Sequence, residues 1–116
     1  MNATPSATSD LTRRKCKACE GDAARLNETQ VTTLLAEVPG WERAGGEIAK
    51  TFKFKNYHET MAFVNATAWV SHREDHHPDL EVGYNKCRVR YSTHSVGGLS
   101  ENDFICAAKL ESLFNV

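Results

Sequence analysis

Three histidines stand where predicted secondary-structure elements end, and histidine is the residue type best suited to move protons near neutral pH. His76 and His77 precede Pro78 at the end of a predicted long helix, and His94 follows the last predicted strand. Because the unperturbed imidazole pKa is ~6.5, histidine can both donate and accept a proton in one cycle. Polar residues beside loops on a rigid scaffold are where sites are commonly built. These positions predict a candidate acid–base site.

A structural role and a metal site are the alternatives to that interpretation. A histidine at a helix end often only caps carbonyl groups, and short motifs match by chance. As neighbours in extended chain, His76 and His77 point to opposite sides, which suits joint ligation of one ion poorly. His72 and His76 have the spacing of a zinc protease motif, but Arg73 follows His72 where that motif requires Glu. We therefore predict no catalytic metal.

The cysteines are predicted to be free thiols. Cys87 and Cys106 fall on predicted apolar faces, where cysteine is usually inert packing, so a cysteine nucleophile is not expected. Cys16 and Cys19 form a single C-x-x-C motif. One such pair without a second is a weak signal, so a zinc site completed by a partner chain and a redox pair stay as alternatives to two free thiols.

Length and composition describe one small domain without a strong charge. The chain has 116 residues, 41% of them hydrophobic, and 14 basic against 15 acidic residues give a formal net charge of −1. That length suits one compact domain. The near-neutral balance does not suggest a nucleic-acid or anionic-membrane surface. Because there is no apolar run of transmembrane length and no secretory signal, we expect a cytoplasmic protein with no membrane contact and reduced thiols.

The chain is expected to divide into a flexible tail, residues 1–26, and a folded domain, residues 27–116. The tail is rich in Ser, Thr, Ala and charge and has no apolar periodicity. Asn27 and Gln30 then form a capping-box pattern, which predicts a helix start. Apolar residues follow at the spacing of one helix face, and Pro39-Gly40 ends this helix. The face consists of Val31, Leu34, Leu35 and Val38.

Two strands and a long helix are predicted next. Residues 41–44 and 48–55 have strand patterns and flank Gly45-Gly46, a pair that tolerates the positive φ of a tight hairpin. Asn56 and Glu59 form a second capping-box pattern, which begins a helix that runs to residue 75. We expect the apolar stripe of this helix to lie across the sheet. The stripe consists of Tyr57, Met61, Val64 and Ala68, with Trp69 beside it.

The last third predicts a second hairpin and a final helix. Residues 80–84 and 87–91 alternate apolar and polar side chains, and Ser100 with Asp103 caps a helix after them. His94 shares strand parity with Arg88 and Arg90, so it should face away from the core. The order α-β-β-α-β-β-α predicts an α+β domain: a four-stranded, largely antiparallel sheet with helices packed on one face. Open sheet edges pair readily with a second copy, so we expect a homo-oligomer.

Four sequence blocks, in this order, are similar to those of one known family. They are Glu74-Asp75-His76-His77-Pro78-Asp79-Leu80, Tyr84-Asn85-Lys86, Ser92-Thr93-His94 and Gly98-Leu99-Ser100-Glu101-Asn102-Asp103. With Pro-Gly-Trp at 39–41 and Phe-Lys-Phe at 52–54, they resemble the pterin-4a-carbinolamine dehydratase family over residues 28–114. The two histidine blocks and the Gly-Leu-Ser-x-x-Asp block together are far more specific than any single motif.

The resemblance implies a fold of this kind, assembled as a homodimer or homotetramer. It also implies an activity, the dehydration of the 4a-carbinolamine made by aromatic amino-acid hydroxylases to a quinonoid dihydropterin. The pterin is then the substrate, no separate cofactor is expected, and function is coupled to such a hydroxylase. The family's three active-site histidines fall on His76, His77 and His94, and an acidic residue falls on Asp103.

The resemblance suggests roles for these residues. His76 and His94 exchange protons with the 4a-hydroxyl and the ring, and His77 orients the pterin. Many members carry Glu four residues before the first histidine, where this chain has His72, so either Glu74 or no carboxylate takes that part. The expected substrate-binding residues are Glu74, Pro78, Asp79, Ser92, Thr93 and Asp103.

A protein-interaction module is the second interpretation of the whole chain. The family that it resembles includes dimerisation cofactors of a transcription regulator, and an open sheet edge suits binding. In that case the histidines could be replaced without loss of function. The near-neutral composition and the complete histidine set favour the enzyme.

Overall fold

The computed structural model describes residues 7–17 and 24–114, which contain helices, strands and one short 3₁₀ helix. The helices are α1 (Ala7–Arg13), α2 (Glu28–Leu35), α3 (Tyr57–Glu74) and α4 (Glu101–Ser112). The strands are β1 (Glu42–Ala44), β2 (Glu47–Lys53), β3 (Asp79–Val82) and β4 (Lys86–Tyr91), and the 3₁₀ helix η1 (His94–Val96) follows β4. The predicted α+β class is confirmed.

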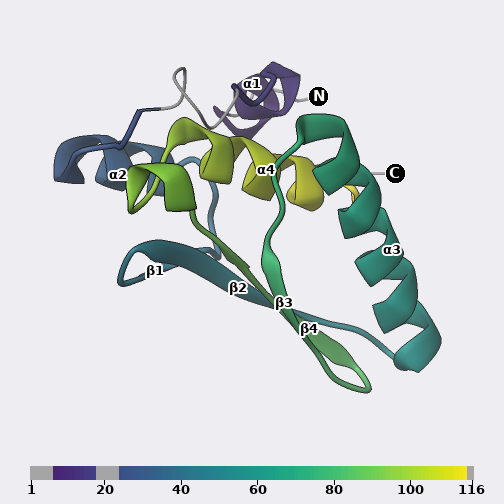
Figure 1. Ribbon diagram of the computed structural model, residues 1–116. Helices are drawn as coiled ribbons and strands as arrows, with labels where there is room; N and C mark the ends of the chain where they lie inside the picture. The colour runs from purple at the N-terminus through teal and green to yellow at the C-terminus, as the bar shows by residue number, and fades with distance from the viewer. Residues whose placement is uncertain (1–6, 18–23, 115–116) are drawn as a thin grey trace.

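The four strands form one antiparallel sheet in the order β1-β2-β4-β3. Both predicted hairpins are present, and Gly45 has the positive φ of 63° that the first turn requires. One face of the sheet is buried, and α4 crosses above it (Figure 1). That face carries Ile48, Phe52, Cys87, Val89 and Tyr91. Arg88 and Arg90 alternate with these residues along β4 and therefore project from the opposite face.

Local capping explains where three of the helices begin. The Asn27–Gln30 and Ser100–Asp103 capping boxes are both complete, so these two sequence predictions are confirmed. Asn56 caps α3 by accepting from the backbone N–H of Glu59. The Glu59 carboxylate accepts instead from the backbone N–H of Lys55, so the predicted Asn56–Glu59 box is only half formed.

The helix most deeply buried is α4, and the prediction that the apolar stripe of α3 covers the sheet is wrong. From Asn102 to Ala108 every residue of α4 is buried. The buried face of α3 consists of Thr60, Phe63, Thr67, Val70 and Glu74, whereas Tyr57 and Trp69 are exposed. The buried face differs from the predicted one because it includes two threonines whose hydroxyls are hydrogen-bonded. The Thr60 hydroxyl donates to the carbonyls of Asn56 and Tyr84, and the Thr67 hydroxyl donates to the carbonyl of Val64. A hydroxyl that is hydrogen-bonded in this way can be buried at little cost.

The expectation that ordered structure begins only at Asn27 does not hold for residues 7–17. Helix α1 packs against α4, and Leu11 is completely buried. A single apolar residue among polar ones produces no periodic signal, which is why this segment has the sequence pattern of a tail. The division of the chain at residue 27 and the flexibility of the tail remain predictions. Residues 1–6 and 18–23 lie outside the described part of the chain.

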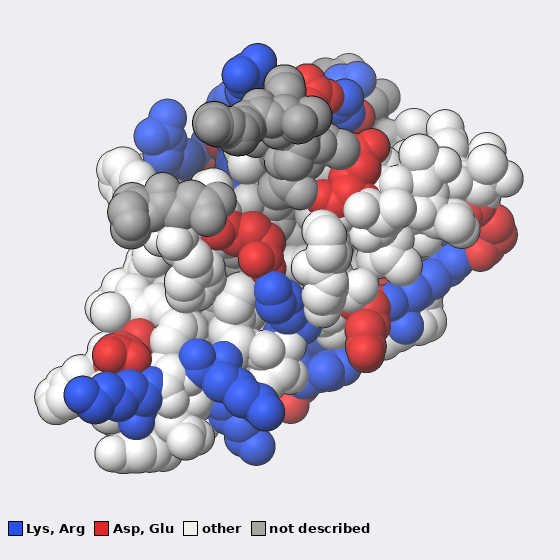
Figure 2. Space-filling view, turned by 180° about the vertical axis from the view of Figure 1, so that it is seen from behind, with Lys and Arg blue, Asp and Glu red and all other residues white. Residues whose placement is uncertain are grey.

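Charged side chains of both signs share the surface. Figure 2 shows Lys and Arg beside Asp and Glu on one face of the molecule. On the sheet, Arg90 lies between Glu47 and Glu81, at 3.4 and 3.2 Å. Among the described helices, none has the length and apolar character needed to cross a membrane.

Candidate active site

A hollow lies where the end of α3 meets the turn after β4, and it brings the three predicted histidines together. It has a volume of about 310 Å³ and is lined by Asp75, His76, His77, Ser92, His94 and Ser95. We call it the histidine hollow. This volume is at the lower end of the ~300–1,000 Å³ typical of small-molecule sites. Of the predicted substrate-binding residues, Ser92 lines it directly.

The end of α3 sets the position of His76. Asp75 closes the helix in the left-handed conformation, with φ 53° and ψ 43°, and the backbone N–H of His76 donates to the Ser71 carbonyl at 3.2 Å. Asp tolerates this conformation better than most residues that have a Cβ. The chain therefore leaves the helix sharply, and the His76 ring turns inward, where only 7% of the residue is exposed.

His76 is paired with Asp103, which α4 supplies from its first turn. His76 Nε2 lies 2.7 Å from Asp103 Oδ1, and Asp103 is completely buried. Thr93 donates its hydroxyl to Asp103 Oδ2 at 2.8 Å, and the backbone N–H of Ser100 donates to the same oxygen at 3.0 Å. The two assigned donors, the Thr93 hydroxyl and the Ser100 N–H, both reach Oδ2, an arrangement that suits a carboxylate that only accepts hydrogen bonds. From this geometry we infer that His76 Nε2 carries a hydrogen and donates to Asp103 Oδ1.

The residues that support Asp103 also begin α4. The bond from the Ser100 N–H is half of the capping box, so the helix start and the site share one interaction. Because Thr93 donates to Asp103, its oxygen accepts from the Ser100 hydroxyl, 2.7 Å away. Thr93 is 1% exposed and so does not line the hollow as predicted, but supports Asp103 from behind.

Tyr91 forms an apolar wall against the other side of His76. The two rings are stacked, with centroids 5.8 Å apart and planes 10° apart. Burial, with the thiols of Cys106 and Cys16 and the Asp103 carboxylate nearby, raises the pKa of the Tyr91 hydroxyl well above its usual value. Tyr91 therefore stays neutral. It restricts the rotation of the His76 ring without adding a charge.

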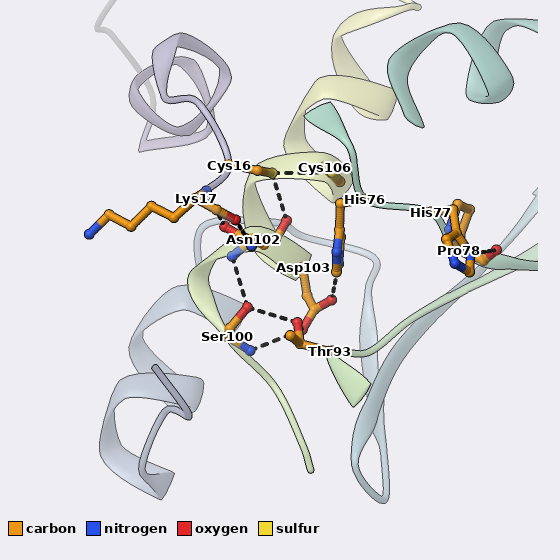
Figure 3. Close-up of polar contacts among 10 residues, drawn as sticks. All are labelled: Cys16, Lys17, His76, His77, Pro78, Thr93, Ser100, Asn102, Asp103 and Cys106. Atoms are coloured by element: carbon orange, nitrogen blue, oxygen red, sulfur yellow. Dashed lines mark hydrogen bonds and ion pairs between the residues drawn. The ribbon is translucent and has the colours of Figure 1, made fainter. Parts of the chain in front are cut away.

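The other two histidines are exposed. His94 begins η1, which ends at Gly97 with a left-handed φ of 69°. His77 lies apart from His76, with its Nδ1 3.4 Å from the Pro78 carbonyl, and the two rings project in different directions (Figure 3). The expectation from sequence that these neighbours point apart is met. The hollow thus combines one buried imidazole with two exposed ones.

Three of the expected substrate-binding residues lie elsewhere. Asp79 begins β3, opposite Arg90 on the sheet, and is not among the lining residues, while Pro78 contributes its carbonyl to His77. Glu74 is buried against α4, where it accepts from the backbone N–H of Cys16 at 2.9 Å and pairs with Lys109 at 3.1 Å. Burial alone would raise the pKa of Glu74. The Cys16 N–H together with Lys109 and Lys15 outweighs burial and holds this pKa below its usual value.

Asp75 and Ser95 line the hollow without having been predicted. Asp75 had a usable signal, because an acidic residue at a helix end directly before a histidine pair must lie near that pair. Ser95 had none, because its position depends on η1, a single turn that carries no periodicity. Within residues 7–17 and 24–114, no group of three His, Cys, Asp or Glu side chains is arranged to hold a metal ion. Cys19, half of the proposed C-x-x-C site, lies outside the described residues.

Comparison with known families and proteins identifies similar chains. Residues 24–113 match the family model described as pterin 4 alpha carbinolamine dehydratase. A relative from Nitrosospira multiformis, named for this dehydratase, is 59% identical over 92% of this chain and 95% of its own length. A second, from Nitrosomonas europaea and named for the same enzyme, is 62% identical over 90% of this chain and 94% of its own length.

Two solved structures have a similar fold. A Brucella melitensis protein, titled a transcriptional coactivator/pterin dehydratase, has a TM-score of 0.74 and 31% identity over 77% of this chain and 97% of its own. A pterin dehydratase-like protein, identified as a RuBisCO assembly factor in the alpha-carboxysome, has a TM-score of 0.53 and 24% identity over 63% of this chain and 84% of its own. At that identity the second likeness concerns the fold alone. The match over residues 24–113 and the high identity to these relatives show that this chain belongs to the pterin-4a-carbinolamine dehydratase family.

Proposed function

We propose that this protein removes water from a 4a-hydroxytetrahydropterin by general acid–base catalysis in the histidine hollow. The observation that carries the proposal is the buried His76–Asp103 pair, 2.7 Å apart, in the wall of a hollow that also presents His77 and His94. Membership of the dehydratase family supports the reaction class.

The chemistry requires two proton transfers and no electron transfer. The C4a–O bond breaks as the lone pair of the neighbouring ring nitrogen forms a double bond, and a proton must be added because hydroxide is a poor leaving group. A ring N–H loses a proton, so the products are water and the quinonoid dihydropterin. The oxidation level of the pterin plus water is unchanged, and the pterin is the substrate, so the reaction as written requires no further cofactor. Histidine side chains suit both transfers near neutral pH.

The two kinds of histidine suit different parts of this reaction. His94 is exposed and can approach the 4a-hydroxyl as the proton donor. His76 exchanges a proton with the ring, and Asp103 stabilises the imidazolium that forms when His76 is protonated. His77 orients the pterin together with Ser92 at the rim.

The proposal also covers the source of the substrate, the cellular compartment and the oligomeric state. The substrate must come from an oxygenase that leaves a hydroxyl on pterin carbon C4a, which is the chemistry of an aromatic amino-acid hydroxylase. We place the reaction in the cytoplasm. We also propose a homodimer or homotetramer, because β1 and β3 are the outer strands of the sheet within the described residues and sheet edges pair readily.

The test is a direct measurement of dehydration. A pterin-dependent hydroxylase would generate the 4a-hydroxytetrahydropterin in situ, and absorbance would follow quinonoid dihydropterin. We expect the wild type to accelerate its formation and a folded His76→Ala/His94→Ala variant to lose the acceleration. His58→Ala is the matched control, because His58 is exposed on the first turn of α3 and is not a lining residue. No acceleration by the wild type would contradict the proposal and leave a protein-interaction module as the working hypothesis.

A further inference from the structure

Residues 14–17, which we call the strap, lie against both the end of α3 and the start of α4 and form hydrogen bonds with each. They follow α1 and lie before residue 24, where the family match begins. The functional role of the strap is therefore a question that the family assignment does not answer. The strap contacts the same two elements that supply His76 and Asp103.

Asn102 of α4 is the centre of the strap's contacts with that helix. Its side-chain carbonyl accepts from the backbone N–H of Lys17 at 3.0 Å, and its amide donates back to the Lys17 carbonyl at 2.8 Å. Arg14 pairs with Glu101 at 2.5 Å. Asn102 is 2% exposed and directly precedes Asp103. The strap and His76 thus bond to consecutive residues, Asn102 and Asp103, in the first turn of α4 (Figure 3).

The strap also contacts the last turn of α3. The backbone N–H of Cys16 donates to buried Glu74, and the Lys15 ammonium donates to the Arg73 carbonyl at 2.6 Å. Glu74 stands two residues before His76. The Cys16 thiol lies 3.6 Å from the Cys106 thiol, further along α4. This thiol contact and then burial raise the pKa of Cys16, so the docked thiol is protonated and poorly reactive.

We propose that the strap is a positioning element for the Asp103–His76 pair and that Asn102 is its principal anchor. The strap holds the end of α3 and the start of α4 at a fixed separation, and that separation sets the 2.7 Å contact between the two side chains. The kinetic part of this inference rests on the proposed dehydratase function. The structural part does not, because alignment of the pair fixes the His76 ring as the Nε2–H tautomer with or without substrate.

The test uses the full chain with Asn102→Ala, which removes both bonds to Lys17. Arg14→Ala is a milder second variant at a half-exposed site, in case Asn102→Ala does not fold. Asn65→Ala is the matched control, because it also removes an asparagine side chain, at an exposed position in the middle of α3 rather than in its last turn. Alkylation of Cys16 by iodoacetamide, followed by peptide mass analysis, measures release of the strap. Nitrogen NMR shifts of His76 measure its tautomer, and the dehydration assay gives kcat and KM.

Asn102→Ala should speed alkylation of Cys16 by roughly tenfold or more. When the strap detaches from α4, the Cys16 thiol becomes exposed to solvent and ionises more readily. It should also mix the tautomers of His76. The dehydration kcat should fall by about tenfold while KM changes less than about twofold, because misalignment affects proton transfer rather than the exposed rim. Arg14→Ala should change each measurement in the same direction but less, and Asn65→Ala should match the wild type.

Faster alkylation of Cys16 with an unchanged His76 tautomer would overturn the inference. So would wild-type Cys16 that reacts as fast as a free peptide thiol, because the strap would then not be docked. If the wild type showed no dehydration, only the proposed function would fail, and the tautomer and alkylation measurements would still decide the role of the strap.

Discussion

The buried and exposed halves of the histidine hollow contain the same residue type in opposite surroundings. His76 is 7% exposed, stacked on Tyr91 and bonded to a carboxylate that two further donors hold. His77 and His94 are exposed, and the contact from His77 to the Pro78 carbonyl is long, at 3.4 Å. The buried ring therefore has one orientation, and the exposed rings can adjust to a ligand.

This difference indicates a division of labour. A buried, fully bonded network is rigid, so it suits a proton transfer that requires fixed geometry. Its members are also part of the core, because Asp103 caps α4 and Thr93 supports Asp103. Substitutions in the buried half should therefore affect both stability and activity. Substitutions in the exposed half should affect activity alone.

The largest effect is expected from Asp103→Asn. The amide that replaces one oxygen cannot accept from the Thr93 hydroxyl or the Ser100 N–H, or else cannot accept from His76. The free energy of unfolding should fall by about 2–5 kcal/mol, since buried donors lose a charged acceptor. The dehydration rate of the folded fraction should fall roughly 10²–10⁴-fold. Urea unfolding and the pterin assay measure the two effects. A variant with wild-type stability and activity would show that the buried half contributes neither to stability nor to catalysis.

His94→Ala tests the exposed half of the histidine hollow. Because His94 is exposed, the free energy of unfolding should change by less than about 0.5 kcal/mol. The dehydration rate should fall about 10²–10⁴-fold, the usual contribution of one general acid or base. The same urea and pterin measurements apply. Destabilisation comparable to that of Asp103→Asn would contradict the assignment of His94 to an exposed, adaptable half.

Thr93→Val tests the support behind Asp103 with almost no change in side-chain shape. The variant removes the hydroxyl that donates to Asp103 and accepts from Ser100. We expect a loss of about 1–2 kcal/mol in the free energy of unfolding and a smaller fall in activity than Asp103→Asn produces. Thr51→Val, on an exposed position of β2, is the control and should be neutral in urea unfolding. Equal effects in the two variants would contradict a supporting role for Thr93.

The smallest effect concerns Glu74, outside the hollow, and depends on pH. Its pKa is held below the usual value in the folded protein, so its contribution to stability is present at neutral pH and is lost as pH falls through the folded pKa. Glu74→Gln should lower stability at pH 7 by on the order of 1 kcal/mol and make stability less sensitive to pH below the usual Glu pKa of ~4.3. Thermal unfolding between pH 3 and 7 measures this. Parallel pH curves for the wild type and the variant would contradict it.

Elements fixed by short-range patterns could be predicted from the sequence. The Asn27 and Ser100 capping boxes, the alternation in β2 and β4 and the family's histidine blocks all depend on neighbours within a few residues. Features that depend on contacts distant in sequence could not. Burial of Thr60 requires the Tyr84 carbonyl, docking of the strap requires Asn102, and the contacts of Glu74 with Cys16 and Lys109 turn it away from the hollow.

The central claim is that Asp103 acts on the pterin through His76, and a double-mutant cycle tests it most directly. Dehydration rates would be measured for Asp103→Asn, His76→Ala and the double variant, each confirmed to be folded by circular dichroism. If the two residues act as one unit, Asp103→Asn should cost roughly 10²–10⁴-fold in the wild type but almost nothing once His76 is absent. Fully additive losses would show that Asp103 affects the reaction independently of His76 and would contradict the account.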